Sequence, residues 1–175
     1  MKIRIALKSC ALAIGATLAF GALAQNAPPA AAPAGAAAGG ARMGGGPSPA
    51  ERAIEYRKSL YTVIGGNFTP IGNVLQGRGE YNAADITKRA DRVAFLAAMV
   101  SEAFPDISKE GNTKAKPEIW ANADDFAAKT KAFVDSSAAL AVLMKTDKTN
   151  SAAFKAAAGK VGEACKGCHD NYRAK

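Results

Sequence analysis

Apolar side chains recur at helical spacing along two long segments, and this periodicity limits the fold more than any other feature of the sequence. The first segment steps by four and three residues through Phe126, Thr130, Phe133, Ser137, Leu140 and Met144. The second repeats the pattern through Phe154, Ala158, Val161, Cys165, Cys168 and Tyr172. Stripes of this period lie on one face of a helix and pack into the core of a helical bundle. Because no convincing run of alternating β-branched residues occurs, the sequence predicts an all-α fold.

Helix-start signals divide the same region into four segments. Ser48, Pro49 and Glu51 combine a capping box with proline at the first helical position. Asn82 and Asn122 each stand shortly before an acidic residue, which is the pattern of an N-cap and a first turn. A fourth start lies in TNSAAF at 149–154. We predict a left-handed, antiparallel up-down four-helix bundle with helices over about 49–76, 83–102, 123–145 and 151–173.

Two features interrupt this regular pattern. Pro70 removes one backbone hydrogen bond late in the first helix, so we expect a kink or broken last turns there. The connection over residues 103–122 is unusually long and contains Pro105 and Pro117. We expect Trp120 to pin this connection against the bundle.

The N-terminal part differs in kind from the rest of the chain. Residues 1–24 begin with three cations, Lys2, Arg4 and Lys8. An apolar run and a small-x-small site follow, which is the layout of a secretory signal peptide. The run is short for a membrane span, so an uncleaved anchor is the weaker alternative. Residues 25–47 are nearly all Ala, Gly and Pro and predict a disordered, flexible tether, which leaves residues 48–175 as the folded domain.

The charge balance argues against one class of partner. The full chain of 175 residues has 23 Lys and Arg against 15 Asp and Glu, a formal net charge of +8. Loss of the three signal-peptide cations lowers this charge to +5. The remaining charges of both signs are mixed along the chain without a basic run, so we predict no nucleic-acid surface. We also predict no membrane attachment after signal cleavage.

Residues 165–173, CKGCHDNYR, contain the only histidine and every cysteine except Cys10. Three chemistries use such a cluster: a redox disulfide, part of a zinc site, and covalent haem attachment. A redox CxxC usually opens a helix beside a sheet, whereas this one falls in the last turns of an all-helical chain. Zinc prefers four ligands, and Cys165, Cys168 and His169 supply only three, so an Asp or Glu would have to complete the site.

Haem attachment agrees with every part of this motif. CxxCH is the signature of c-type haem, in which both thiols bond to the haem and the adjacent histidine binds the iron. Residues 165, 168 and 169 share one helix face, and that face is the apolar stripe. Export agrees as well, because cysteines reserved for haem must survive in an oxidising compartment. We therefore predict one covalent haem c with its iron, anchored by Cys165 and Cys168, with His169 as the axial ligand.

A second iron ligand is harder to find. A low-spin electron carrier usually has His or Met in this position, and the only histidine is already used. Met144 is expected at the far end of the bundle, and Met99 is marginal in helical phase. The first helix has no methionine and offers three side chains at the haem level: Arg57, Lys58 and Tyr61. We predict iron held by His169 alone, with Lys58 or Met99 as the alternative sixth ligand.

Four stretches of the domain resemble a bacterial cytochrome c′. They are EYRKSLYTVIGGNF at 55–68, GEYNAADI at 79–86, AKPEIW at 115–120 and VGEACKGCHDNYRAK at 161–175. The resemblance covers the predicted domain almost end to end. It implies a periplasmic haem protein with five-coordinate, high-spin iron that binds nitric oxide and carbon monoxide and is often a homodimer.

The resemblance also implies roles for single residues. Cys165 and Cys168 would be the thioether anchors and His169 the proximal ligand. Arg57 would stand at the haem edge, suited to a propionate, and Tyr61 would cover the distal face. From the residues alone, Tyr61 could equally be a core aromatic, and Arg57 a surface residue with its stem along the core.

Four further positions have looser implied roles. Arg173 would stand near the proximal histidine, although a cation there also suits the end of a helix. Lys58 falls where many members have glutamine. Thr113 and Lys114 are the nearest equivalents of a haem contact in the loop before PEIW.

The sequence therefore predicts a periplasmic haem protein that binds nitric oxide or carbon monoxide and is capable of electron transfer with an unknown redox partner. The alternatives are a six-coordinate, low-spin electron-transfer protein of the same fold and a haem-free helical binding module. We expect no enzyme, because the only imidazole is assigned to iron and no nucleophile–base pair can be assembled.

Overall fold

The computed structural model describes residues 45–175, which fold into four long helices and three short helical segments. The long helices are α1 (Pro49–Leu75), α2 (Ala83–Ala97), α4 (Ala123–Thr146) and α5 (Ala152–Tyr172). The short segments are the 3₁₀ turns η1 (Ser101–Ala103) and η2 (Asp106–Ser108) and the helix α3 (Glu118–Ala121). The prediction of an all-helical domain is confirmed. The predicted signal peptide and nearly all of the predicted tether lie outside the described residues and stay predictions.

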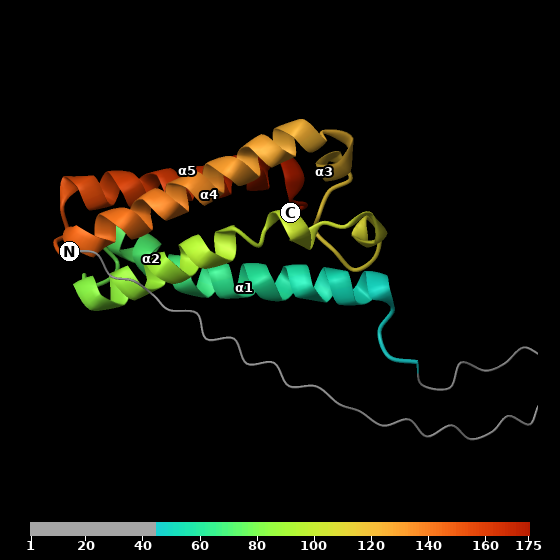
Figure 1. The fold of residues 1–175 in the computed structure, drawn as a ribbon, viewed down its shortest axis with the longest axis horizontal. Coiled ribbons are helices and arrows are strands. Elements are labelled where there is room, and N and C mark those ends of the chain that lie inside the picture. The colour runs from blue at the N-terminus through green and yellow to red at the C-terminus, as the bar shows by residue number, and fades with distance from the viewer. Residues whose placement is uncertain (1–44) are drawn as a thin grey trace, which may run out of the picture. The chain divides into compact units, whose positions relative to one another are not determined.

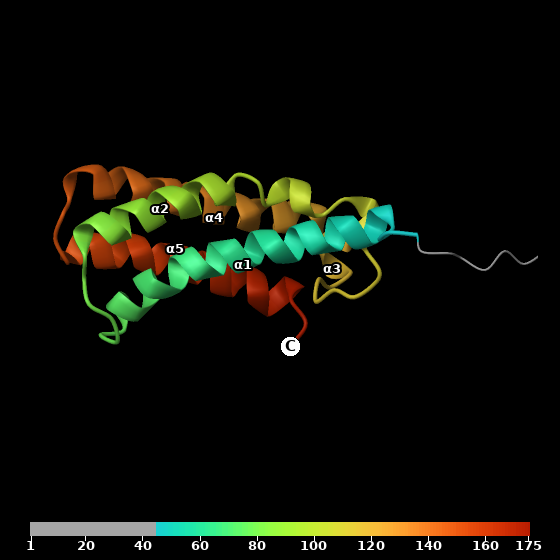
Figure 2. The same cartoon turned by 90° about the horizontal axis from the view of Figure 1, so that it is seen from below.

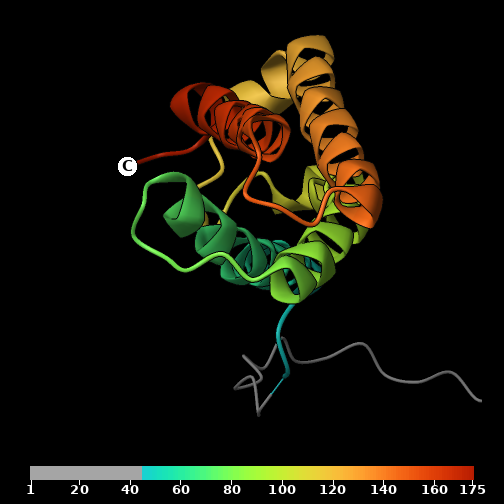
Figure 3. The same ribbon diagram turned by 90° about the vertical axis from the view of Figure 1, so that its left-hand side faces the viewer.

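The four long helices form an up-down bundle. Helices α1 and α4 run in one direction, and α2 and α5 run in the other (Figure 1). The end-on view shows the four helices arranged in a ring around a shared interior (Figure 3). Short connections at 76–82 and 147–151 join neighbouring antiparallel helices, as short loops must. The end of α5 therefore lies at the same end of the bundle as the start of α1 and α3 (Figure 2). The predicted left-handed twist stays a prediction.

Side-chain caps explain where three of the four long helices begin. Ser48 and Glu51 form the predicted capping box of α1. The side chain of Asn82 accepts a hydrogen bond from the Asp85 amide at 3.0 Å, and that of Ser151 caps α5 in the same way. Helix α4 starts directly after Asn122 as predicted, but the Asn122 side chain makes no capping hydrogen bond. Helix α3 ends immediately before α4, and the Asn122 amide donates back to its first residue instead.

Pro70 does not break α1, which continues to Leu75. Proline has no N–H, so the carbonyl of Gly66, four residues earlier, loses its helical donor. Arg89 of α2 donates to that carbonyl at 3.2 Å, while its Nε lies 2.6 Å from Asp85. A neighbouring helix thus satisfies the group that proline leaves free.

The second helix is shorter than expected and ends at Ala97 instead of near residue 102. The amides of Met99 and Val100 donate to carbonyls three residues back, which tightens the chain into 3₁₀ geometry before Pro105. The long connection then packs on the bundle as predicted. The indole of Trp120 donates to the Phe104 carbonyl at 3.1 Å and pins this segment.

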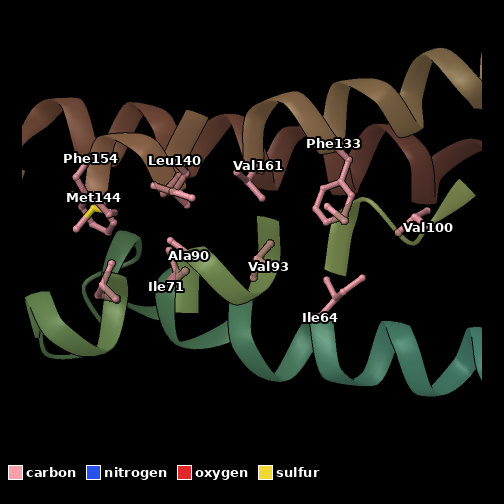
Figure 4. Close-up of a cluster of buried hydrophobic side chains, with 14 of the residues drawn as sticks. Ile64, Ile71, Ala90, Val93, Val100, Phe133, Leu140, Met144, Phe154 and Val161 are labelled. Atoms are coloured by element: carbon pink, nitrogen blue, oxygen red, sulfur yellow. The ribbon is translucent and has the colours of Figure 1, made fainter. Parts of the chain in front are cut away.

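The main core lies between all four long helices. Its labelled side chains point inward from the four long helices and, for Val100, from the turn after α2 (Figure 4): Ile64, Ile71, Ala90, Val93, Val100, Phe133, Leu140, Met144, Phe154 and Val161. Leu140 is fully buried, so truncating it to alanine would cost about 2–5 kcal/mol. Within residues 45–175, no helix is both long and apolar enough to cross a membrane.

Candidate haem site

The last turns of α5 bring the three CxxCH side chains to one region of the bundle. Cys165 packs against the main core, and Cys168 packs against a smaller aromatic cluster built on Ile119, Phe126 and Tyr172. Both thiols are free and half-buried. Residues 165, 168 and 169 follow the i, i+3, i+4 spacing of one helix face, as predicted. The two thiols therefore lie where the main core meets the aromatic cluster.

Burial sets the protonation of this motif. Desolvation, followed by the nearby Cys168, raises the pKa of the Cys165 thiol to about 11. Burial likewise raises the pKa of Cys168, so both groups are neutral thiols at neutral pH. His169 is largely exposed, and partial desolvation and the charge of Arg173 lower its pKa. Its imidazole is therefore neutral at neutral pH, which is the form that binds iron.

Tyr61 of α1 lies near the two thiols on the inner side of the bundle. Its side chain is half-buried and packs against the main core. Burial raises the pKa of its phenol, and charge on Cys168 and Cys165 would raise it further. The phenol is therefore neutral and can donate a hydrogen bond. The structure thus brings Tyr61 together with the CxxCH thiols.

Phe104 occupies the centre of an aromatic group at this end of the bundle. Its ring meets those of Phe126, Trp120 and Tyr61 edge to face, at centroid distances of 4.8, 6.2 and 6.3 Å. The ring of Tyr172 meets Phe126 at 5.3 Å. These rings give the site an apolar wall, which suits a large aromatic cofactor.

Arg57 is buried, with only 4% of its surface exposed. Its Nη1 donates to the Ala103 carbonyl at 3.1 Å and to Ser108 Oγ at 2.8 Å. Its Nη2 donates to the Ser108 carbonyl at 3.2 Å and to Thr113 Oγ1 at 2.8 Å. The guanidinium also lies 4.9 Å from the Phe104 ring centroid. In this structure Arg57 therefore ties α1 to the connection between α2 and α4.

Of the remaining predicted contacts, all but Thr113 lie near the surface. Lys58 pairs with Glu55 at 2.9 Å, and both side chains are exposed. Thr113 accepts from Arg57 and thus belongs to the buried network. Lys114 and Arg173 are exposed, but their segments are joined. The Lys114 carbonyl accepts from the Ala174 amide at 2.8 Å, and Ala115 pairs with Arg173 in an isolated bridge.

The two methionines considered as iron ligands differ in position. Met144, in the last turn of α4, is fully buried and lies beside Phe154 of α5 (Figure 4). Phe154 is in the first turn of α5, so both lie at the opposite end of that helix from the CxxCH motif. Met99 is half-buried, follows the end of α2 and packs against the main core.

One buried hydroxyl in α4 and the donor set of α5 bear on the fit of a cofactor between these helices. Thr130 of α4 lies one turn beyond Phe126 on the same face, and only 7% of its surface is exposed. Its hydroxyl has no hydrogen-bond partner within residues 45–175. Neutral thiols, a neutral imidazole and an apolar wall are the donor set and surroundings that haem c requires. The residues present therefore fit this group.

Comparisons with known proteins agree with this site. The family model described as Cytochrome C′ matches residues 52–173. A cytochrome c′ of Rubrivivax gelatinosus is 37% identical over 125 residues, which cover 70% of this chain and 95% of that protein. The chain belongs to the cytochrome c′ family.

Solved structures of cytochromes c′ share the fold. One from Shewanella frigidimarina superposes with a TM-score of 0.69 at 38% identity, covering 74% of this chain and all of that one. A ferrous variant from Alcaligenes xylosoxidans with bound nitric oxide gives 0.64 at 34% identity, covering 72% and 96%. A carbon monoxide-bound variant of the same cytochrome c′ also gives 0.64 at 34% identity, covering 73% and 98%. Membership of the cytochrome c′ family implies haem c with its iron.

Sequence reasoning missed two residues of this cytochrome c′ site. Phe104 follows the end of the helical pattern, so periodicity gave it no role. Ser108, which is fully buried and bonded to Arg57, lies in a segment read only as a loop. One sequence signal could have shown that this connection is packed. It contains two large aromatic residues, Phe104 directly before Pro105 and Trp120 near its end.

Proposed function

We propose that this cytochrome c′ is a periplasmic haem protein with five-coordinate, high-spin iron that binds nitric oxide or carbon monoxide. One haem c would be attached through Cys165 and Cys168, with His169 as the only axial ligand from the chain. When bound, haem supplies an iron atom that can bind a diatomic gas or exchange one electron. The role is binding and electron transfer rather than catalysis.

The observation that carries this proposal is the residue opposite the motif. Tyr61 of α1 lies near both thiols, and a neutral phenol is a poor ligand for haem iron compared with His or Met. Lys58 pairs with Glu55 at the surface, and Met144 lies at the other end of the bundle. The face opposite His169 is therefore left to a small external ligand. The gas-bound relatives from Alcaligenes xylosoxidans support this assignment.

The site also defines what the chain contributes to ligand binding. The aromatic wall excludes water, the phenol of Tyr61 limits space on its side, and its hydroxyl can donate one hydrogen bond to a bound diatomic. The predicted signal peptide supports a periplasmic location.

Absorption spectra of the purified haem-loaded protein test this proposal against the low-spin alternative. We expect a high-spin spectrum in both oxidation states and a shift of the main band when carbon monoxide is added to the reduced protein. A methionine–iron charge-transfer band in the oxidised protein would instead support Met99 as sixth ligand. A denatured sample without covalently bound haem would support the haem-free module.

We propose further that two copies associate through the face shared by α1 and α2. Phe95 and Val63 lie there with 72% and 49% of their surfaces exposed. They line one shallow hollow together with Asp91 and Arg92. A patch with both signs of charge around apolar side chains can complement its own copy about a two-fold axis. The second copy is therefore the partner that this face fits best.

A further inference from the structure

The connection between α2 and α4 approaches the candidate site through one side chain. Phe104 packs against both the main core and the smaller aromatic cluster, and it is the ring that directly meets Tyr61 from this connection. Cys165 belongs to the first group and Cys168 to the second. Phe104 thus contacts Tyr61 and belongs to both of the groups that include a CxxCH thiol.

Phe104 is held on several sides. Its carbonyl accepts from Trp120, and its ring meets Phe126 at 4.8 Å. The residue directly before it, Ala103, and Ser108 a few residues later are both bonded to the Arg57 guanidinium. The same guanidinium faces the ring, in the position of a cation–π pair. The planar guanidinium of Arg57 donates to four acceptors and thereby fixes both ends of the segment 103–108. A lysine has a single nitrogen and could not bond to both ends in this way.

We infer that Phe104 is a wall of the gas-binding pocket that limits ligand entry and that Arg57 is the positioning residue that holds it beside Tyr61. This inference rests on the proposed gas-binding function. In this role Arg57 acts by holding the segment that carries Phe104, whether or not it also contacts a haem propionate. A smaller side chain at 104 should leave room beside Tyr61 and speed ligand entry. A change at Arg57 should have the same effect indirectly, by releasing the segment that carries Phe104.

Carbon monoxide association after flash photolysis tests this in the haem-loaded full chain. We expect Phe104→Leu to raise the association rate about tenfold, the size of a lost aromatic contact. Arg57→Lys keeps the charge but loses the planar guanidinium, and it should also raise the association rate. Because the two residues act through one element, the double variant should be no faster than Phe104→Leu alone. Phe154→Leu makes the same change in a fully buried ring at the far end and should leave the rate unchanged.

Hydrogen exchange of residues 101–121 in the same haem-loaded proteins provides a readout independent of gas binding. Arg57→Lys should speed exchange there and leave α5 unaffected. If the wild-type protein binds no carbon monoxide, the proposed function fails and the pocket role of Phe104 fails with it, while exchange still decides the positioning role of Arg57. If the wild type binds carbon monoxide but Phe104→Leu matches it, or if the two variants are additive, the inference is overturned.

Discussion

Tyr61 is the side chain on which ligand binding should depend most directly. A phenol is neutral at neutral pH, burial raises the pKa of this one further, and it lies near both thiols of α5. Two effects follow from the same group: its ring occupies space, and its hydroxyl can stabilise a bound ligand by a hydrogen bond. These effects oppose each other, and two substitutions separate them.

Tyr61→Ala should raise the carbon monoxide affinity of the reduced protein about tenfold, because it removes the bulk opposite the motif. Tyr61→Phe keeps the ring and should change the affinity by less than Tyr61→Ala does. Equilibrium titration followed by absorption measures both. Wild-type affinity in Tyr61→Ala would remove this residue from the distal side.

The residues of the site differ in how well sequence could predict them. Cys165, Cys168 and His169 lie on one helix turn, so their spacing alone places them together. Arg57 could be matched by resemblance, but its partners are 46 to 56 residues away in the sequence. Which carbonyl and hydroxyl groups reach a buried guanidinium depends on how an irregular connection packs, and no periodicity encodes that.

At the scale of the helices, two asparagines with the same sequence pattern make a sharp comparison. Asn82 accepts from the Asp85 amide, whereas Asn122 makes no side-chain capping bond. Asn82→Ala should therefore lower the free energy of unfolding by about 1 kcal/mol, and Asn122→Ala should leave it nearly unchanged. Urea unfolding followed by circular dichroism compares them. Equal losses would contradict the cap assignment.

The contact between α4 and α5 should make stability depend on alkaline pH. The Tyr172 hydroxyl donates to Asp125, and this hydrogen bond, followed by desolvation, raises the pKa of Tyr172 from 10.0 to about 12. A pKa raised by folding adds stability that is fully present below the unfolded value and is lost as pH rises through the folded value. The contribution is therefore intact below pH 10.0 and disappears towards about 12.

Tyr172→Phe removes that contribution while keeping the ring. The variant should be less stable than the wild type at about pH 8, and the difference should shrink at about pH 12. Urea unfolding of both proteins at the two pH values measures it. A difference that is the same at both pH values would show that the hydrogen bond to Asp125 does not stabilise the neutral phenol.

The helices also show where local rules give way to their neighbours. Pro70 predicted a disturbed helix, and the rule that proline removes a donor is correct. The disturbance is absorbed because Arg89 of α2 reaches the Gly66 carbonyl. That contact joins residues 23 positions apart, so it could not be read from α1 alone. Conversely, α2 ends early where the amides of Met99 and Val100 donate three residues back and tighten the chain into the connection.

For the whole molecule, topology was the most predictable property. The connections after α1 and α4 are too short to allow anything but antiparallel neighbouring helices. The apolar stripes then determine which faces of the helices pack together. The outer faces carry no such constraint. Exposed apolar side chains therefore carry information about association that the pattern of the core does not.

Those outer side chains allow a matched test of the proposed dimer. Phe95 on α2 and Val142 on α4 have nearly equal exposures, 72% and 71%. Only Phe95 shares a hollow with Val63, Asp91 and Arg92. Phe95→Arg should convert a dimer to a monomer in sedimentation velocity, because it places an unpaired charge in the centre of a desolvated interface. Val142→Arg adds the same charge outside that face and should leave the dimer intact. A monomeric wild type would refute the dimer itself, whereas loss of the dimer in Val142→Arg alone would move the interface to α4.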